Sequence, residues 1–254
     1  MTTDSSTESK NKRRKIILWS VGPLFLLLCM TACILMAMAF DDVPMPLDHY
    51  YLRRPKEKEP FIPFYVMQKG ENNYEIMRKS NPYTRASISY EDDEFNYILR
   101  NVIFSNLLNQ SGATGGNRIT AKRTSLILKE GLFHLKYTME TPGNPFGKYL
   151  NLHLVMKLTV KDGVDHIEIV SAKAGSLNIP KFIMEAKVNE VLKENYRGTS
   201  QEKLVKECII DLKTDDKGIS AEYRPYVLRK ELKNVSGGAT GEFLGQLGYD
   251  DSKN

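Results

Sequence analysis

The stretch that decides the fold is "KYLNLHLVMKLTVKDGVDHIEIVSAK", residues 148–173. Apolar side chains occupy every second position of its first half: Leu150, Leu152, Leu154, Met156, Leu158 and Val160. Polar side chains fill most of the positions between them, and Val155 is the exception. This alternation predicts a long strand with one apolar face and one solvated face. Asp162-Gly163 then predicts a tight turn into a second strand over 164–173.

The same alternation continues upstream in "LFHLKYTME", residues 132–140. Its apolar positions are Phe133, Leu135, Tyr137 and Met139, so a third strand precedes the long one. Three successive strands joined by turns form an antiparallel meander. The length of the middle strand predicts that the sheet is strongly curved.

Two amphipathic helices are expected to cover the apolar face. One spans 89–109, with Ser89 as its cap and an acidic first turn over Glu91–Glu94. The other spans 180–196, where Met184, Val188 and Leu192 recur at helical spacing. Residues 64–69 and 86–90 are expected to be short strands, and 201–225 a short helix followed by a hairpin. The fold class is therefore α+β.

The run "IILWSVGPLFLLLCMTACILMAMAF", residues 16–40, contains no charge and predicts a transmembrane helix. Basic residues before it, with Asp41 and Asp42 after it, place the N-terminus in the cytoplasm and the rest outside the cell membrane. Two alternatives stay open. Small residues ending at Ala39 also fit a signal-peptidase site, which would give a secreted or periplasmic protein. Cys33 loosely fits a lipid-attachment site.

These features divide the chain into five segments. They are a cytoplasmic basic tail (1–15), the transmembrane helix (16–40), a spacer rich in proline and charge (41–63), an extracytoplasmic α+β domain (64–235) and a flexible tail (236–254).

The charge distribution argues against nucleic-acid binding. Residues 1–15 hold five basic and two acidic residues, which leaves 31 basic and 29 acidic residues in the rest. A nucleic-acid-binding domain is expected to carry a basic stripe in its folded part.

Residues with reactive side chains do not assemble into a catalytic motif, so we expect no enzyme, no catalytic residue, no metal and no cofactor. His134 and His153 are expected to be neighbours on the polar face of the meander. His166 lies roughly 23 Å further along, which excludes a three-histidine site. Cys208 stands in the apolar stretch "ECIIDL" and is expected to be a buried hydrophobic residue rather than a nucleophile.

The order of elements resembles small, membrane-anchored bacterial envelope proteins of the tubular-lipid-binding-like kind. The resemblance covers roughly 85–233 and rests on "ISYEDDEFNYILR", "KYLNLHLVMKLTV", "HIEIVSAKAGSLNIP" and "CIIDLKTDDKGISAEYRP". It implies a curved sheet that wraps a helix and leaves an apolar groove for an acyl chain. It implies no catalytic residues.

The residues themselves support the same hypothesis of an apolar groove between sheet and helix. Its candidate lining residues are Leu150, Leu152, Leu154, Met156, Leu158, Leu177, Ile179 and Phe182. The corner "SAKAGSLNIPKFIMEAKV", residues 171–188, would form the lip. The expected partners are the membrane and a lipid. The alternatives are an anchored envelope scaffold or assembly partner with a filled core, and an unrecognised hydrolase.

Overall fold

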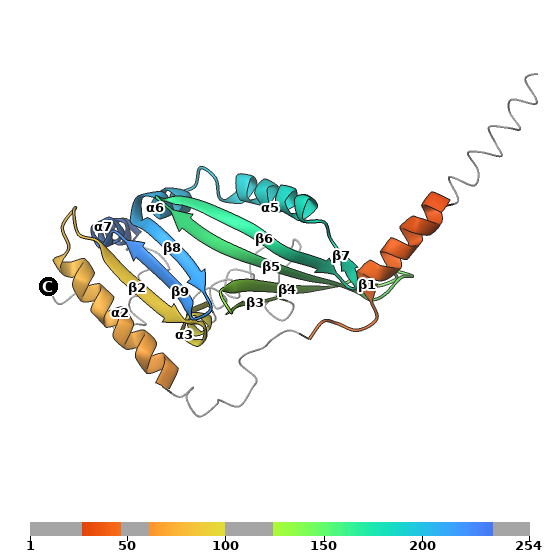
Figure 1. Ribbon diagram of the computed structural model, residues 1–254, viewed down its shortest axis with the longest axis horizontal. Coiled ribbons are helices and arrows are strands. Elements are labelled where there is room, and N and C mark those ends of the chain that lie inside the picture. The colour runs from red at the N-terminus through yellow and green to blue at the C-terminus, as the bar shows by residue number, and fades with distance from the viewer. Residues whose placement is uncertain (1–26, 47–60, 100–123, 236–254) are drawn as a thin grey trace, which may run out of the picture.

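The computed structural model describes residues 27–46, 61–99 and 124–235, and in this part of the chain the fold is α+β, as predicted. Figure 1 shows one elongated sheet with helices along its sides. Residues 16–26 of the apolar run, 100–109 of the first predicted amphipathic helix, and the predicted tail 236–254 lie outside the described residues.

The described strands form one antiparallel sheet, and the three strands of the predicted meander are confirmed as β4, β5 and β6. The strands are β1 (Phe40–Asp41), β2 (Ala86–Glu91), β3 (Thr124–Lys129), β4 (Leu132–Glu140), β5 (Tyr149–Lys161), β6 (Val164–Ala174), β7 (Leu177–Asn178), β8 (Ile209–Asp215) and β9 (Gly218–Tyr223).

The long strand β5 organises the sheet because it has two partners along each edge. One edge pairs with β4 over residues 149–156 and then with β8 at Val160 and Lys161. The other edge pairs with β1 at Tyr149 and Leu150 and then with β6 over residues 152–161. The sheet therefore branches: β4 and β3 continue from one end of β5, and β8, β9 and β2 continue from the other (Figure 1).

Residues 27–39 form a helix that leads into β1, and the five other described helices flank the sheet. They are α2 (Ile62–Lys79), α3 (Asp92–Ile98), α5 (Lys181–Asn195), α6 (Ser200–Cys208) and α7 (Pro225–Val235). The predicted helix over 180–196 is confirmed as α5, and the short helix and hairpin expected over 201–225 are α6, β8 and β9.

Two local predictions were wrong. Residues 64–69 were expected to be a strand but belong to α2, which begins with Pro63 in its first turn and exposes Phe64 and Tyr65. Ser89 was expected to cap α3, but it pairs with Ser220 inside β2. Because this pairing continues to Glu91, the N-cap lies two residues later, with a capping box between Glu91 and Glu94.

The helix α3 packs where the two branches of the sheet diverge. Phe95 meets Phe133 edge to face, with ring centroids 6.0 Å apart, and Leu99 and Leu128 are buried beside them. Asn96 pins the helix to β3, because its amide donates to the Leu128 carbonyl (2.8 Å) and accepts from the Leu128 N–H (2.7 Å). The Asn96 side chain thus forms hydrogen bonds with backbone groups of β3 that would otherwise be exposed at the edge of the described sheet.

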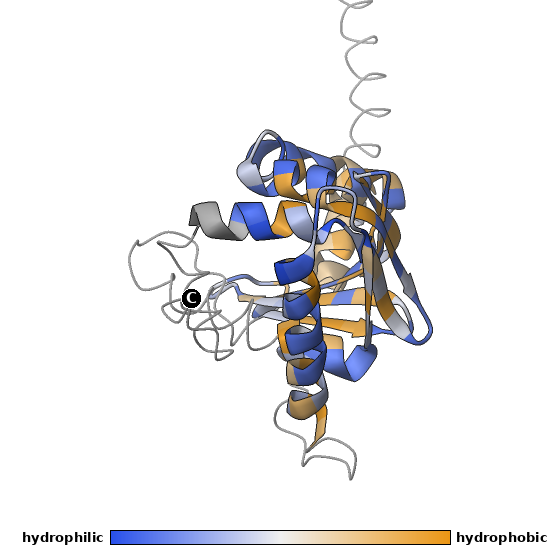
Figure 2. Ribbon diagram, turned by 90° about the vertical axis from the view of Figure 1, so that its left-hand side faces the viewer, coloured by the Kyte–Doolittle hydropathy of each residue, from blue (hydrophilic) through white to orange (hydrophobic). Residues whose placement is uncertain are grey.

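The helix α2 is held by polar contacts rather than by burial, since none of its residues is buried. Lys69 forms an ion pair with Glu94 (2.5 Å), and the Tyr223 hydroxyl donates to Asn73 (2.6 Å). Burial raises the pKa of Tyr223 to about 12, which keeps this donor protonated. Figure 2 shows α2 nearest the viewer, hydrophilic along most of its length and apolar at its N-terminal end.

The transmembrane helix expected over 16–40 is not found in the described part of the chain. Residues 27–39 are helical and expose apolar side chains such as Leu27 and Leu28. Within residues 27–46, 61–99 and 124–235, no single helix meets the length and hydropathy that a bilayer-spanning helix requires.

Candidate functional site

Several polar contacts join distant segments where the helical residues 27–39 meet the sheet. The helix runs directly into β1, which pairs with β5 through Phe40 opposite Leu150. Ser176, in the corner between β6 and β7, donates from its backbone N–H (2.9 Å) and from its hydroxyl (3.1 Å) to the Met38 carbonyl. This corner therefore satisfies a carbonyl in the last turn of the helix, which has no intrahelical donor.

Asn151 is the centre of this junction and is only 4% exposed. Its amide nitrogen donates to Asp41 Oδ2 (2.7 Å) and to the Val43 carbonyl (2.9 Å). Its amide oxygen accepts from the Met45 N–H (2.9 Å) and from the Thr138 hydroxyl (2.9 Å). One side chain thus uses both donors and both lone pairs to hold residues 41–45 against β4 and β5.

Gly175 allows the close approach that the junction requires. It has a φ of +55°, and a Cβ at this position would lie 2.6 Å from the Met38 carbonyl oxygen. Its N–H donates to the backbone carbonyl of Asn151 (2.8 Å). The corner predicted as the lip of a groove therefore receives the end of the helix.

The predicted spacer over 41–63 takes a different form at both ends. Residues 41–45 are bonded to the sheet through Asn151 rather than extended away from it, and Ile62 already begins α2. Residues 47–60 lie outside the described part of the chain. The first residues after the helix are thus a docked strap.

An open pocket of about 520 Å³ lies beside this strap. It is lined by residues 41–46 together with Asn151, Gly175 and Ser176. The described residues hold no group of three His, Cys, Asp or Glu side chains that could bind a metal ion. Its polar side chains are those of Asp41, Asp42, Asn151 and Ser176, and the Ser176 hydroxyl is bonded to the Met38 carbonyl rather than to a carboxylate.

The predicted groove residues are distributed over two apolar clusters. Leu154 is buried with Ile169 and Ala172, and Ile179, Met184 and Val188 pack against them from the α5 side. Met156 and Leu158 also contact the cluster beneath α3. Leu150, Leu152 and Leu177 are half-buried, and the Phe182 side chain is 71% exposed. The helix α5 therefore covers the middle of the apolar stripe, and Phe182 does not line it.

His134 and His153 are neighbours, as predicted. Their rings stack with centroids 5.5 Å apart, and His134 Nδ1 lies 3.3 Å from His153 Nε2. They are diagonal neighbours, since His134 lies opposite Val155 and His153 lies opposite Lys136. Lys136 and Lys173 are the cross-strand partners of His153, and their positive charges oppose a cation there.

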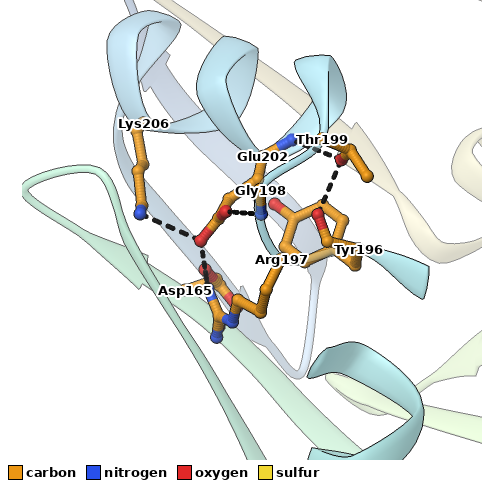
Figure 3. A network of polar contacts seen from close by, with 7 residues as sticks. All are labelled: Asp165, Tyr196, Arg197, Gly198, Thr199, Glu202 and Lys206. Carbon is orange, nitrogen blue, oxygen red and sulfur yellow. Dashed lines mark hydrogen bonds and ion pairs between the residues drawn. The ribbon is translucent and has the colours of Figure 1, made fainter. Parts of the chain in front are cut away.

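A second polar network ties the loop between α5 and α6 to the start of β6 (Figure 3). Arg197 donates to both carboxylate oxygens of Asp165 (2.7 and 2.9 Å) and to Glu202 (2.9 Å). Glu202 also accepts from the Gly198 N–H (2.6 Å) and pairs with Lys206 (2.9 Å). These donors hold the pKa of Glu202 down at about 2, with the Gly198 N–H as the first cause. We call this network of Asp165, Arg197, Gly198, Glu202 and Lys206 the clasp, and its role is structural.

This clasp predicts a dependence of stability on acid. The pKa of Glu202 is about 2 in the folded chain against an ordinary value of 4.5, so its contribution is present above pH 4.5 and is lost as pH falls towards 2. We expect Glu202→Gln to lower the melting temperature at pH 6 and to flatten its decline between pH 4.5 and 2. Circular dichroism melts measure both effects.

The control is Glu207→Gln, which removes an exposed carboxylate from the same helix. Its melting temperature should follow that of the wild type at every pH. If Glu202→Gln and the wild type lost stability in parallel below pH 4.5, the clasp would contribute nothing to acid sensitivity.

Cys208 is 4% exposed, as expected for a buried hydrophobic residue, and burial raises the pKa of its thiol. A raised pKa disfavours the thiolate and with it nucleophilic chemistry.

Comparison with known proteins gives no relative. No family model matches the chain, and neither a curated protein nor a solved structure matches it.

Proposed function

We propose that the protein is a single-pass, membrane-anchored and non-enzymatic protein. The apolar run supplies the anchor up to Ala39, since Phe40 already pairs with Leu150 in β1; the N-terminus is cytoplasmic, and the α+β domain is extracytoplasmic. The observation that carries the proposal is the junction at which the apolar helix ends at Ala39. Ser176 donates to the Met38 carbonyl in the last turn of this helix, and Asn151 bonds residues 41–45 to the sheet. A segment that was removed or merely tethered would not need its last turn satisfied by a distant corner.

We further propose that the domain holds an acyl chain or another apolar ligand against the apolar face of β4 and β5. Two observations support a site between this face and α5. Leu150 and Leu152 are only half-buried, and α5 places no residue in full burial although it lies over the stripe. A lipid chain would complete the cover that the described helices leave partial.

The alternative is an anchored envelope scaffold with a filled core. It is supported by the packing of Met184 and Val188 on Leu154, which already closes the middle of the stripe. In this case the function would lie in contacts with a partner protein rather than with a lipid.

Native mass spectrometry of the full-length protein released from membranes separates the two functions. We expect the wild type to carry a lipid mass, and Leu152→Arg to reduce the lipid-bound fraction about tenfold, because a charge in the site weakens apolar contact by more than about 1.4 kcal/mol. Val164→Arg is the matched control, since Val164 is 63% exposed at the β5–β6 turn. A wild type that carries no lipid would support the scaffold.

A further inference from the structure

The first turn of α5 exposes apolar side chains that the core does not use. Phe182 is 71% exposed and Ile183 is 47% exposed. The next two turns place Lys187, Asn189 and Glu190 on the exposed surface instead. Further along the helix Val191 is also exposed (47%), but the N-terminal turn is the place where two adjacent large apolar side chains are exposed together.

This turn lies beside the junction. The chain reaches it from the β6–β7 corner, where Ser176 is bonded to Met38 and the Ile179 N–H to the Ala172 carbonyl (2.9 Å). Figure 1 shows α5 on the side of the sheet from which residues 27–39 leave, with its N-terminal end nearest to them. The last turn of the helix and the first turn of α5 therefore face the same side of the molecule.

The charges at this end of the domain favour neither an anionic nor a cationic membrane surface. Lys148, Lys173 and Lys181 are balanced by Asp41, Asp42 and Glu140. Attraction to anionic lipids is thus a small term here, and burial of apolar area is the larger one.

We propose that Phe182 and Ile183 enter the headgroup region of the same bilayer that holds the anchor. This inference rests on the proposed membrane anchor. A helix that ends at residue 39 brings the outer interface to the level of β1, and the first turn of α5 is adjacent to it through the corner. Aromatic and aliphatic side chains partition to this depth. The domain then touches the bilayer at two places, which fixes its orientation.

Depth-dependent fluorescence quenching tests the proposal with the full-length chain in phosphatidylcholine vesicles. Trp19 is the only tryptophan of the chain, so Trp19→Phe gives a silent background for Phe182→Trp. Lipids brominated near the headgroup end of their acyl chains are expected to quench most of the emission of this variant. Tyr83→Trp in the same background is the control, because Tyr83 is 93% exposed in the α2–β2 turn, far from the helical residues 27–39.

The wild type separates the two proposals, since Trp19 lies inside the proposed anchor. Quenching of Trp19 and of Phe182→Trp, with none of Tyr83→Trp, supports both. If Trp19 were quenched and Phe182→Trp emitted like Tyr83→Trp, the interfacial contact would be overturned and the anchor would stand. If Trp19 itself escaped quenching, the anchor and the contact would both be overturned.

Discussion

Asn151→Leu is expected to lower the free energy of unfolding by about 3 kcal/mol, because four hydrogen bonds are lost at once and one of them leaves the buried Thr138 hydroxyl without its acceptor. The Thr138 hydroxyl and the Met45 N–H lose their acceptor, and Asp41 and the Val43 carbonyl lose their donor. Leucine has nearly the same size, so the loss is one of hydrogen bonds rather than of volume. Chemical denaturation of the full-length protein in detergent measures the change.

A local readout distinguishes this effect from general destabilisation. Hydrogen exchange at residues 41–46 should accelerate more than exchange in β8 and β9, because the strap is released before the sheet opens. The matched control is Asn72→Leu on the exposed side of α2, which should be near neutral. Equal stability of Asn151→Leu and Asn72→Leu would show that the junction does not hold the strap.

Gly163→Ala is expected to destabilise the fold by about 3 kcal/mol through two separate effects. Gly163 has a φ of +76°, which costs a residue with a Cβ about 1 kcal/mol. The added Cβ would also lie 2.4 Å from the Lys206 carbonyl oxygen, so α6 or the β5–β6 turn must shift. The turn is held against β8 by the Asp162 N–H, which donates to the Ile210 carbonyl (2.7 Å).

Gly143→Ala separates these two effects. Gly143 has a similar φ of +82°, and a Cβ there meets no atom within 4 Å. We expect this variant to lose only the conformational part, about 1 kcal/mol. Equal losses in the two variants, measured by urea denaturation, would mean that contact between the turn and α6 is unimportant.

The sequence predicted the meander because its information is local. The alternation over β4, β5 and β6, broken in β5 only at Val155, and the Asp162-Gly163 pair are sufficient to define three strands and a hairpin turn, and the structure confirms both. Helical spacing likewise identified α5. These patterns are strong because one face of each element is apolar over several successive positions.

The same reasoning failed where position in the fold overrides a short pattern. Residues 64–69 are apolar enough to suggest a strand, yet they belong to the start of a helix. Lys69 and Asn73 hold this helix through contacts with Glu94 and Tyr223, which are distant in the sequence. The clasp at Glu202 had a usable signal, since Thr199 and Glu202 have the spacing of a capping box. Its other partners, Asp165 and Arg197, come from different elements and have no shared pattern.

The role of Asn151 could not be predicted from the sequence. In the alternation of β5 it occupies a polar position and is indistinguishable from a solvated asparagine. Its partners at residues 41–45 precede it in the sequence by more than a hundred residues. Only the pairing of β1 with β5 brings the two together, and β1 is two residues long. A strand of this length leaves no periodic signal.

The sequence separation across the junction also sets an order of events during synthesis. Asp41 and Asn151 are 110 residues apart, and Met38 and Ser176 are 138 residues apart. The apolar helix leaves the ribosome long before the corner that satisfies its last turn exists, and closing so large a loop waits for the meander. During this interval no contact of the junction fixes the nascent domain relative to the helix. Completion of β6 and the corner after it supplies these contacts, and with the proposed anchor it would set the orientation of the finished domain.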